Sequence, residues 1–145
     1  MQETIEAFLR GDMPRGTFVL RYRIGSGFSG LTTLEVRGNG DYEAVSTVTE
    51  GRRKLHFTGR ISSERLERLV QAVAEARVWE TPADFGIPKL DEPVPTIAVE
   101  ADGEEQEVSV PASRLKEVPT FARAQEAMLE FVREVSDGAV LESGR

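Results

Sequence analysis

Hydrophobic and polar residues alternate through much of the first half of the chain, which is the pattern of half-buried β-strands. In such a segment a period of two places the apolar side chains on one face of the strand. The alternation predicts four strands, over residues 17–24, 31–37, 42–48 and 55–61. The Asn39-Gly40 pair between the second and third strands indicates a tight hairpin, because both residues tolerate a positive φ. Short connections predict that the four strands form an antiparallel meander with one face in water.

Three other segments carry apolar residues at the spacing of an amphipathic helix. They cover residues 2–10, 63–78 and 119–135. Ser62 is a favourable N-cap for the second of these helices. Between the last two helices, alternation predicts a final hairpin that turns at Asp102-Gly103, with one strand over residues 97–101 and another that includes Val108 and Val110.

Together these elements predict an α+β fold. We expect an antiparallel sheet of about six strands, built as a four-strand meander, a helix, a hairpin and a helix, with the two long helices on one face. Residues 1–16 are expected to form an N-terminal helix and linker, and residues 17–135 a single α+β domain. Residues 136–145 are small and polar, so we expect a flexible tail.

Composition narrows the function mainly by exclusion. The 145 residues include no cysteine and one histidine, which excludes a thiolate nucleophile and disfavours a histidine-rich zinc site or a Ser-His-Asp triad. The net charge of −7 repels phosphate backbones, so we expect no nucleic-acid partner. No apolar run approaches the ~20 residues that span a bilayer, and the N-terminus lacks the pattern of a signal peptide. We therefore expect a cytoplasmic protein with no cofactor, no metal and no membrane partner.

Residues 25–30, Gly-Ser-Gly-Phe-Ser-Gly, match the glycine spacing of a dinucleotide-binding loop. Such a loop needs a helix N-terminus directly after it to hold the pyrophosphate, whereas residues 31–37 alternate as a strand. Two interpretations remain. The segment is a glycine-rich connection between two strands, or it is a contact tip that presents Phe28 to another protein.

The connector of residues 80–95 is the second segment that could meet a partner. It contains four prolines and shows no periodic pattern. Its acidic residues Asp84, Asp91 and Glu92 are either solvated loop charges or an acidic binding loop. Proline rigidity would lower the entropy cost of presenting such a loop to a partner.

Two strings in the chain resemble one known family. Residues 22–31, Tyr-Arg-Ile-Gly-Ser-Gly-Phe-Ser-Gly-Leu, resemble the strand, glycine turn and second strand of the emfourin-like (protealysin-inhibitor-like) family of small bacterial proteins. Residues 61–66, Ile-Ser-Ser-Glu-Arg-Leu, resemble the start of that family's helix. Ser26 stands where the family has a second glycine, and the hairpin over residues 38–54 is longer than in the shortest members of the family. The family's characterised member inhibits thermolysin-like metallopeptidases, so the resemblance implies such a peptidase as the partner.

These observations leave two functions to compare. The first is a non-catalytic protein-binding module, most specifically a metallopeptidase inhibitor, with the contact residues Gly25, Gly27, Phe28, Gly30, Asp84, Phe85, Asp91 and Glu92. The second is a small-ligand or assembly domain whose exposed sheet face holds an anion through bidentate arginines. Its residues would be Arg21, Arg23, Arg37, His56 and Arg60.

Three further expectations limit these hypotheses. An ordinary solvated sheet face is the plainer interpretation of the arginine group. The sequence offers His56 no carboxylate partner, so we expect a solvated histidine among cations. We expect no enzyme, because no nucleophile, base and orienting group are visible together. The oligomeric state is left open.

Overall fold

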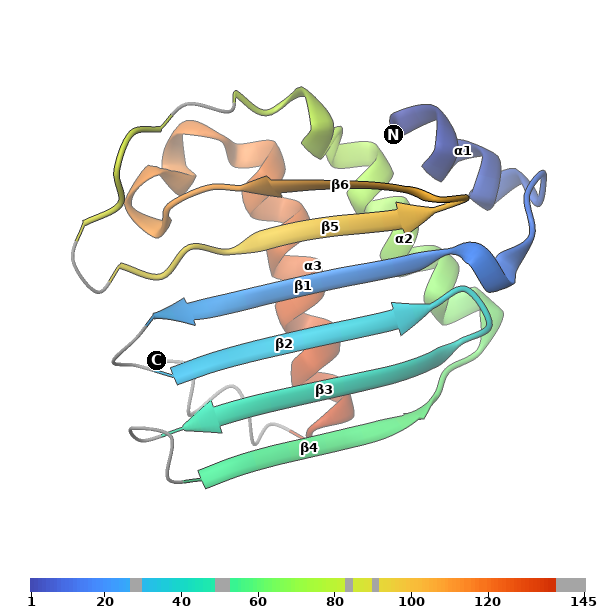
Figure 1. The fold of residues 1–145 in the computed structure, drawn as a ribbon, viewed down its shortest axis with the longest axis horizontal. Helices are drawn as coiled ribbons and strands as arrows, with labels where there is room; N and C mark the ends of the chain where they lie inside the picture. Colours follow the sequence, from blue (N-terminus) through green and yellow to red (C-terminus); the bar gives the residue numbers. More distant parts are fainter. Residues whose placement is uncertain (27–29, 49–52, 83–84, 90–91, 138–145) are drawn as a thin grey trace.

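The computed structural model describes residues 1–26, 30–48, 53–82, 85–89 and 92–137. Its centre is one six-stranded sheet in which every neighbouring pair of strands is antiparallel. The strands are β1 (Val19–Ser26), β2 (Gly30–Arg37), β3 (Asp41–Val48), β4 (Arg53–Arg60), β5 (Thr96–Ala101) and β6 (Glu104–Ser109). They lie in the order β4-β3-β2-β1-β5-β6 (Figure 1). The predicted meander and final hairpin are confirmed.

Three α-helices cover one face of this sheet. They are α1 (Gln2–Arg10), α2 (Ser63–Ala76) and α3 (Pro119–Val135), and all three lie behind the sheet in Figure 1. Short 3₁₀ turns connect the elements: η1 (Arg15–Thr17), η2 (Val78–Glu80) and η3 (Ala112–Glu117). The expected α+β architecture, with the long helices on one face, is therefore present. We call the opposite face of the sheet the open face.

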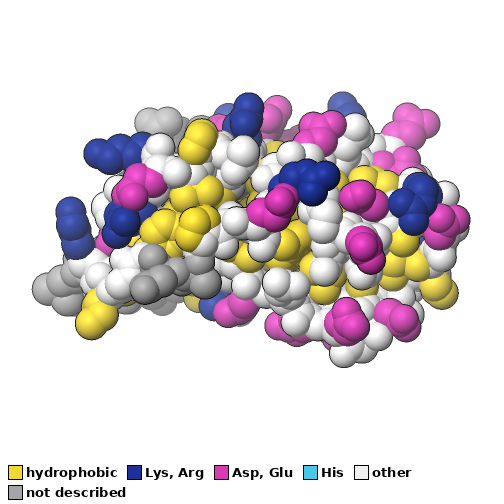
Figure 2. Space-filling model, turned by 90° about the horizontal axis from the view of Figure 1, so that it is seen from above, with side chains coloured by type: hydrophobic (Ala, Val, Ile, Leu, Met, Phe, Trp, Pro, Cys, Tyr) yellow, Lys and Arg dark blue, Asp and Glu magenta, His cyan; other side chains and the backbone are white. Residues whose placement is uncertain are grey.

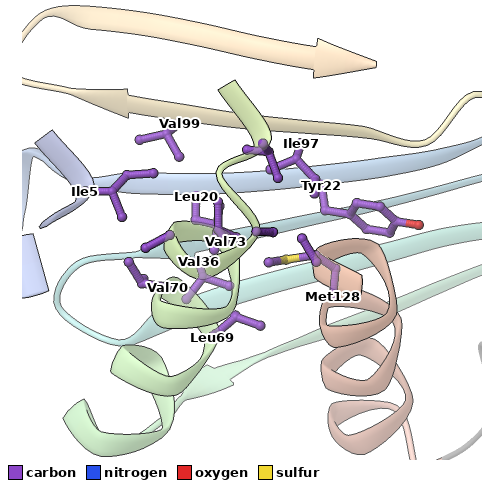
Figure 3. Packing of buried hydrophobic residues seen from close by; sticks show 14 of the residues in the cluster. Ile5, Leu20, Tyr22, Val36, Leu69, Val70, Val73, Ile97, Val99 and Met128 are labelled. Atoms are coloured by element: carbon purple, nitrogen blue, oxygen red, sulfur yellow. The ribbon is translucent and has the colours of Figure 1, made fainter. Parts of the chain in front are cut away.

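The hydrophobic core lies between the sheet and the helices. Figure 3 shows side chains from β1, β2, β5 and all three helices meeting in this layer. One polar pair lies inside it: Gln125 Nε2 donates a hydrogen bond to the hydroxyl of Tyr22 at 3.2 Å, and both residues are buried. Burial raises the pKa of Tyr22 above its ordinary value, because the phenolate would be poorly solvated there.

The N-terminal segment contributes to the same core. Ile5 and Phe8 on α1 are buried, and the ring of Phe8 stacks on Phe18 with 4.1 Å between the centroids. Residues 1–16 thus contain the predicted helix, α1, and this helix packs onto the core beside the sheet. Residues 138–145, most of the expected tail, lie outside the described residues.

Two of the differences from the predicted boundaries have a clear local cause. The first strand begins at Val19 rather than residue 17, because residues 15–17 form η1. Helix α2 begins as predicted, with Ser62 Oγ accepting a hydrogen bond from Arg65 N at 3.1 Å. It ends at Ala76, because Arg77 adopts a left-handed conformation with φ 48°. This break lets the next residue, Val78, turn into the core.

Strand β6 forms one edge of the sheet and carries acidic side chains. Glu104, Glu105 and Glu107 are all exposed on it. Figure 2 looks onto this side of the molecule and shows acidic side chains spread along it around patches of hydrophobic surface. Charged edges discourage pairing with a second sheet.

Candidate functional site

The connector between α2 and β5 is tied to the segment that follows β6. Val110 N donates to Pro95 O at 3.2 Å, and Ala112 N donates to Pro93 O at 2.9 Å. These two bonds continue the β5–β6 ladder before the first residue of β5 and beyond the last residue of β6. The described part of the connector has no helix or strand after η2, as predicted, but its C-terminal end is fixed against η3.

Glu92 fixes this end of the connector through its carboxylate. Its Oε2 accepts a hydrogen bond from Lys89 N at 2.8 Å, and its Oε1 accepts one from Ser113 N at 2.5 Å. Glu92 N also donates to Lys89 O at 3.1 Å. Hydrogen bonds from Ser113 and from the Lys89 backbone lower the pKa of Glu92, because they favour the charged form. The carboxylate of Glu92 therefore holds the connector against η3. We call these hydrogen bonds of Glu92 the loop latch.

Phe85 fixes the other end of the same loop. Its ring lies partly buried against the core, under the guanidinium of Arg114, with 5.5 Å from Cζ to the ring centroid. Arg114 Nη1 also donates to Phe85 O at 3.2 Å. Glu117 orients this guanidinium by accepting hydrogen bonds from its Nε and Nη2, the latter at 3.0 Å. The pKa of Glu117 is lowered by these bonds.

Ile87 lies between these two anchors and is 95% exposed. The chain bends at this residue, and Gly86, Pro88 and Lys89 beside it are exposed as well. The other large hydrophobic residue that is exposed in the described part of the chain is Leu31, at 46%. We define residues 85–89 as the presentation loop. This loop exposes the aliphatic side chain of Ile87 to water. Contacts from η3 hold the backbone on either side of it, through Phe85 and through Glu92.

The glycine turn is a tight connection at the positions that can be described. Gly25 pairs with Leu31 across the β1–β2 ladder and has φ +152°. A Cβ on Gly25 would lie 2.1 Å from the carbonyl oxygen of Gly30, so only glycine fits there. Gly30 itself has φ +94°. Gly27 and Phe28, the proposed contact tip, lie outside the described residues, as do Asp84 and Asp91 of the connector.

The five residues of the proposed anion site do share the open face, but they do not converge. Arg21 Nε lies 3.1 Å from Glu35 Oε1, and its Nη1 lies 2.9 Å from Glu100 Oε2. Arg37 Nη2 shares Glu35, at 3.3 Å from Oε2. Arg23 Nη2 is 3.8 Å from Glu107 Oε1. The guanidinium groups are thus separated from one another by carboxylates.

The remaining two residues of that set are paired in the same way. Arg60 Nε lies 2.9 Å from Asp41 Oδ1, and this hydrogen bond lowers the pKa of Asp41. His56 Nε2 lies 2.9 Å from Glu43 Oε2 on β3. The expectation that His56 has no carboxylate partner was wrong, because Glu43 becomes its neighbour only through the β3–β4 register.

A shallow hollow of about 280 Å³ lies on the open face among these pairs. Its charged lining comprises Arg21, Arg23, Glu35, Glu43, Glu105 and Glu107. An anion entering it would have to displace carboxylates from both arginines. This arrangement disfavours the anion-binding hypothesis relative to the presentation loop.

Sequence reasoning missed Ile87, Arg114 and Ser113. Ile87 has no periodic apolar neighbours, so no pattern distinguishes it from a packed residue. One signal was available: an isolated aliphatic residue between glycine and proline in a connector with four prolines. The role of Arg114 and Ser113 depends on how β6 and η3 meet the connector, which no local pattern encodes.

No protein-family model matches the chain, and no curated protein matches it. None of the helices in the described part of the chain has the length and apolar character that a membrane span requires. Within that same part, no group of three or more histidine, aspartate or glutamate side chains is placed to hold a metal ion.

Proposed function

We propose that this protein is a non-catalytic protein-binding module that contacts its partner through the presentation loop. The observation that carries the proposal is Ile87, which is 95% exposed between the anchors at Phe85 and Glu92. An isolated aliphatic side chain held in water gains free energy only when another molecule covers it. Burial of one such side chain contributes roughly 1.5–3 kcal/mol.

The two anchors favour binding because they restrict the loop before the partner arrives. Ordering a loop at an interface opposes association, and a loop already held in one conformation avoids most of that cost. The Arg114 contacts at Phe85 and the Ser113 contact at Glu92 both come from η3, so one rigid segment orients the whole loop. A single apolar side chain on a fixed backbone then serves as the anchor that fills a pocket on the partner.

The finer proposal is that the partner is a thermolysin-like metallopeptidase, which the protein inhibits. It rests on the resemblance of residues 22–31 and 61–66 to the emfourin-like family of small bacterial proteins. An inhibitor needs a rigid loop and no catalytic group of its own. The presentation loop supplies the rigid loop. A chain with one histidine and no cysteine agrees with the lack of a catalytic group.

The test compares three immobilised proteins as baits in the same native lysate: the wild type, Ile87→Asp and Leu31→Asp. Leu31 is the matched control, an exposed aliphatic residue on the open face. We expect one partner to be captured equally by the wild type and Leu31→Asp, and at least ~30-fold less by Ile87→Asp. Equal capture by Ile87→Asp would refute the loop as the contact surface. Unchanged thermal unfolding of each variant shows that the fold is intact.

The finer proposal is tested with a purified thermolysin-like metallopeptidase. We expect the wild-type protein to inhibit hydrolysis of a small peptide substrate at micromolar concentration or below. No inhibition at that concentration would refute the peptidase as the partner. The bait experiment in the native lysate would then still test whether the protein is a binding module.

A further inference from the structure

In the described part of the chain, the sheet ends in β4 at one edge and in β6 at the other. Along an antiparallel ladder, residues that bond the neighbouring strand alternate with residues whose N–H and C=O point away from it. Val110 N donates to Pro95 O at 3.2 Å, in phase with the β5–β6 ladder. The outward backbone groups of β6 therefore belong to Glu105, Glu107 and Ser109, which we call the acidic row.

The same alternation identifies the outward residues of β4. Ile61 N donates to Gly40 O at 2.9 Å, in phase with the β3–β4 ladder. The outward backbone groups of β4 therefore belong to a second set, which we call the basic row: Lys54, His56, Thr58 and Arg60. The side chains of both rows lie on the open face, and all of them except that of Ser109 are exposed.

The directions of the two edge strands allow one copy of the chain to continue the sheet of another. Strands β4 and β6 run in opposite directions (Figure 1). A second copy with its open face turned to the same side would therefore bring its β4 antiparallel to β6 of the first. The acidic and basic rows would stand opposite each other, because both carry outward N–H and C=O groups on the same face. Addition of a strand to a sheet edge uses this pattern of main-chain hydrogen bonds.

The charges of the two rows select this combination of edges. The acidic row has two carboxylates, whereas the basic row has two cations and no carboxylate. Opposite charges across a pair of strands stabilise it, and like charges destabilise it. Two β6 edges repel each other, as do two β4 edges, so β6 with β4 is the favoured pairing. Existing ion pairs oppose it little: Glu107 Oε1 lies 3.8 Å from Arg23 Nη2, and exposed pairs contribute little free energy.

Hydrophobic surface accompanies both edges on the helix side of the sheet. Leu55 and Phe57 on β4 pack against the core but are only half-buried, and so is Val108 on β6. Figure 2 shows hydrophobic patches between the acidic side chains on the β6 side of the molecule. A neighbouring copy at either edge would cover part of this surface, which favours association.

We propose that copies of this protein associate head to tail, with β6 of one copy paired to β4 of the next in one continuous sheet. Each pair of copies leaves one β6 and one β4 uncovered. The contact can therefore repeat, and it gives chains or rings rather than a closed dimer. It uses no residue of the presentation loop, so it is independent of the proposed function.

The first experiment reverses the charge of each row and measures mass by sedimentation velocity, from about 10 μM to about 1 mM protein. The acidic-row variant is Glu105→Lys/Glu107→Lys, and the basic-row variant is Lys54→Glu/Arg60→Glu. We expect the average mass of the wild type to rise beyond that of a dimer, while each variant alone stays monomeric. An equimolar mixture of the two variants should associate again, because its rows are complementary. A wild type that is monomeric at ~1 mM, or a mixture that stays monomeric, would overturn the proposal.

Two control proteins show whether the edges are the contact. Glu75→Lys/Glu130→Lys makes the same change in net charge at exposed positions on α2 and α3, and should associate as the wild type does. Ile87→Asp should also associate like the wild type, because it alters neither row. Monomeric behaviour of either control would overturn the edge contact. Unchanged thermal unfolding of every variant shows that the fold is intact.

A second experiment tests the backbone pairing without reversing a charge. Glu107→Pro and Glu107→Ala both remove the carboxylate, but only the proline also removes the outward N–H. That N–H does not bond β5, so proline is compatible with the edge of the sheet. We expect Glu107→Pro to associate at least ~10-fold more weakly than Glu107→Ala. Equal association of the two variants would overturn the proposed strand pairing.

Discussion

Replacing Tyr22 with phenylalanine should destabilise the protein, although it removes only one oxygen atom. Gln125 Nε2 donates to the Tyr22 hydroxyl at 3.2 Å, and the two residues are only 1% and 8% exposed. Tyr22→Phe leaves this amide donor without its partner in the core, which costs about 1–3 kcal/mol. An unfolding entropy of about 2.1 cal/mol/K per residue gives ~0.3 kcal/mol/K for this chain, so Tm should fall by about 3–10 °C.

The double variant Tyr22→Phe/Gln125→Leu separates this explanation from a packing effect. It removes the donor and the acceptor together, so most of the lost stability should return. Thermal and urea unfolding of the wild type, both single variants and the double variant give the coupling free energy. A change within ~0.5 kcal/mol for Tyr22→Phe would refute the reasoning. So would a double variant that shows the plain sum of the two single losses.

The same tyrosine gives a pH dependence with a defined sign. Burial raises the pKa of Tyr22 in the folded protein above the ordinary value of about 10, so the folded state holds this proton more tightly than the unfolded state does. Its contribution to stability is complete below pH ~10 and is lost as the pH rises from there towards the folded pKa. Tyr22→Phe should lack this alkaline loss in urea unfolding, and an identical alkaline profile would contradict the burial of the hydroxyl.

Two further predictions concern the loop latch and the glycine turn. The pKa of Glu92 is lowered in the folded protein, so its hold on the loop is complete above the ordinary glutamate pKa of about 4.3 and is lost as the pH falls through the folded pKa. Amide exchange at Lys89 and Ser113 should accelerate there, whereas Glu92→Gln should show no such transition; protection that does not change with pH would contradict the latch. Gly25→Ala should cost more than the ~1–3 kcal/mol of backbone strain alone, because its Cβ would meet the Gly30 oxygen at 2.1 Å. Gly11→Ala, at φ +79° with nothing within 4 Å, should show only the strain, and equal losses in urea unfolding would argue against the close approach.

Much of the fold could be predicted because it is encoded by local patterns. Alternation placed Leu20 and Tyr22 on the core face of β1, and the hairpin at Asn39-Gly40 turns through the positive φ of Gly40, +97°. The N-cap at Ser62 also depends only on its own neighbours along the chain. Features of this kind need no knowledge of what packs against them.

The features that were missed depend on contacts between segments far apart in the sequence. Glu43 meets His56 because of the β3–β4 register, and Arg114 reaches Phe85 because η3 lies against the connector. The arginines of the open face were correctly placed on one face, but the carboxylate partners of Arg21, Arg23 and Arg60 lie on other strands. Periodicity shows which face a side chain occupies and leaves open which side chain lies beside it.

The absence of cysteine from the chain allows a direct test of the central claim, that a partner covers Ile87. A single cysteine is introduced as Ile87→Cys, or as Leu31→Cys for the control, and each thiol is coupled to a bulky maleimide. Binding to the captured partner is then measured before and after coupling. The account predicts that the adduct at position 87 abolishes binding, whereas the adduct at position 31 leaves the affinity unchanged. Full affinity with the bulky group at position 87 would contradict the claim.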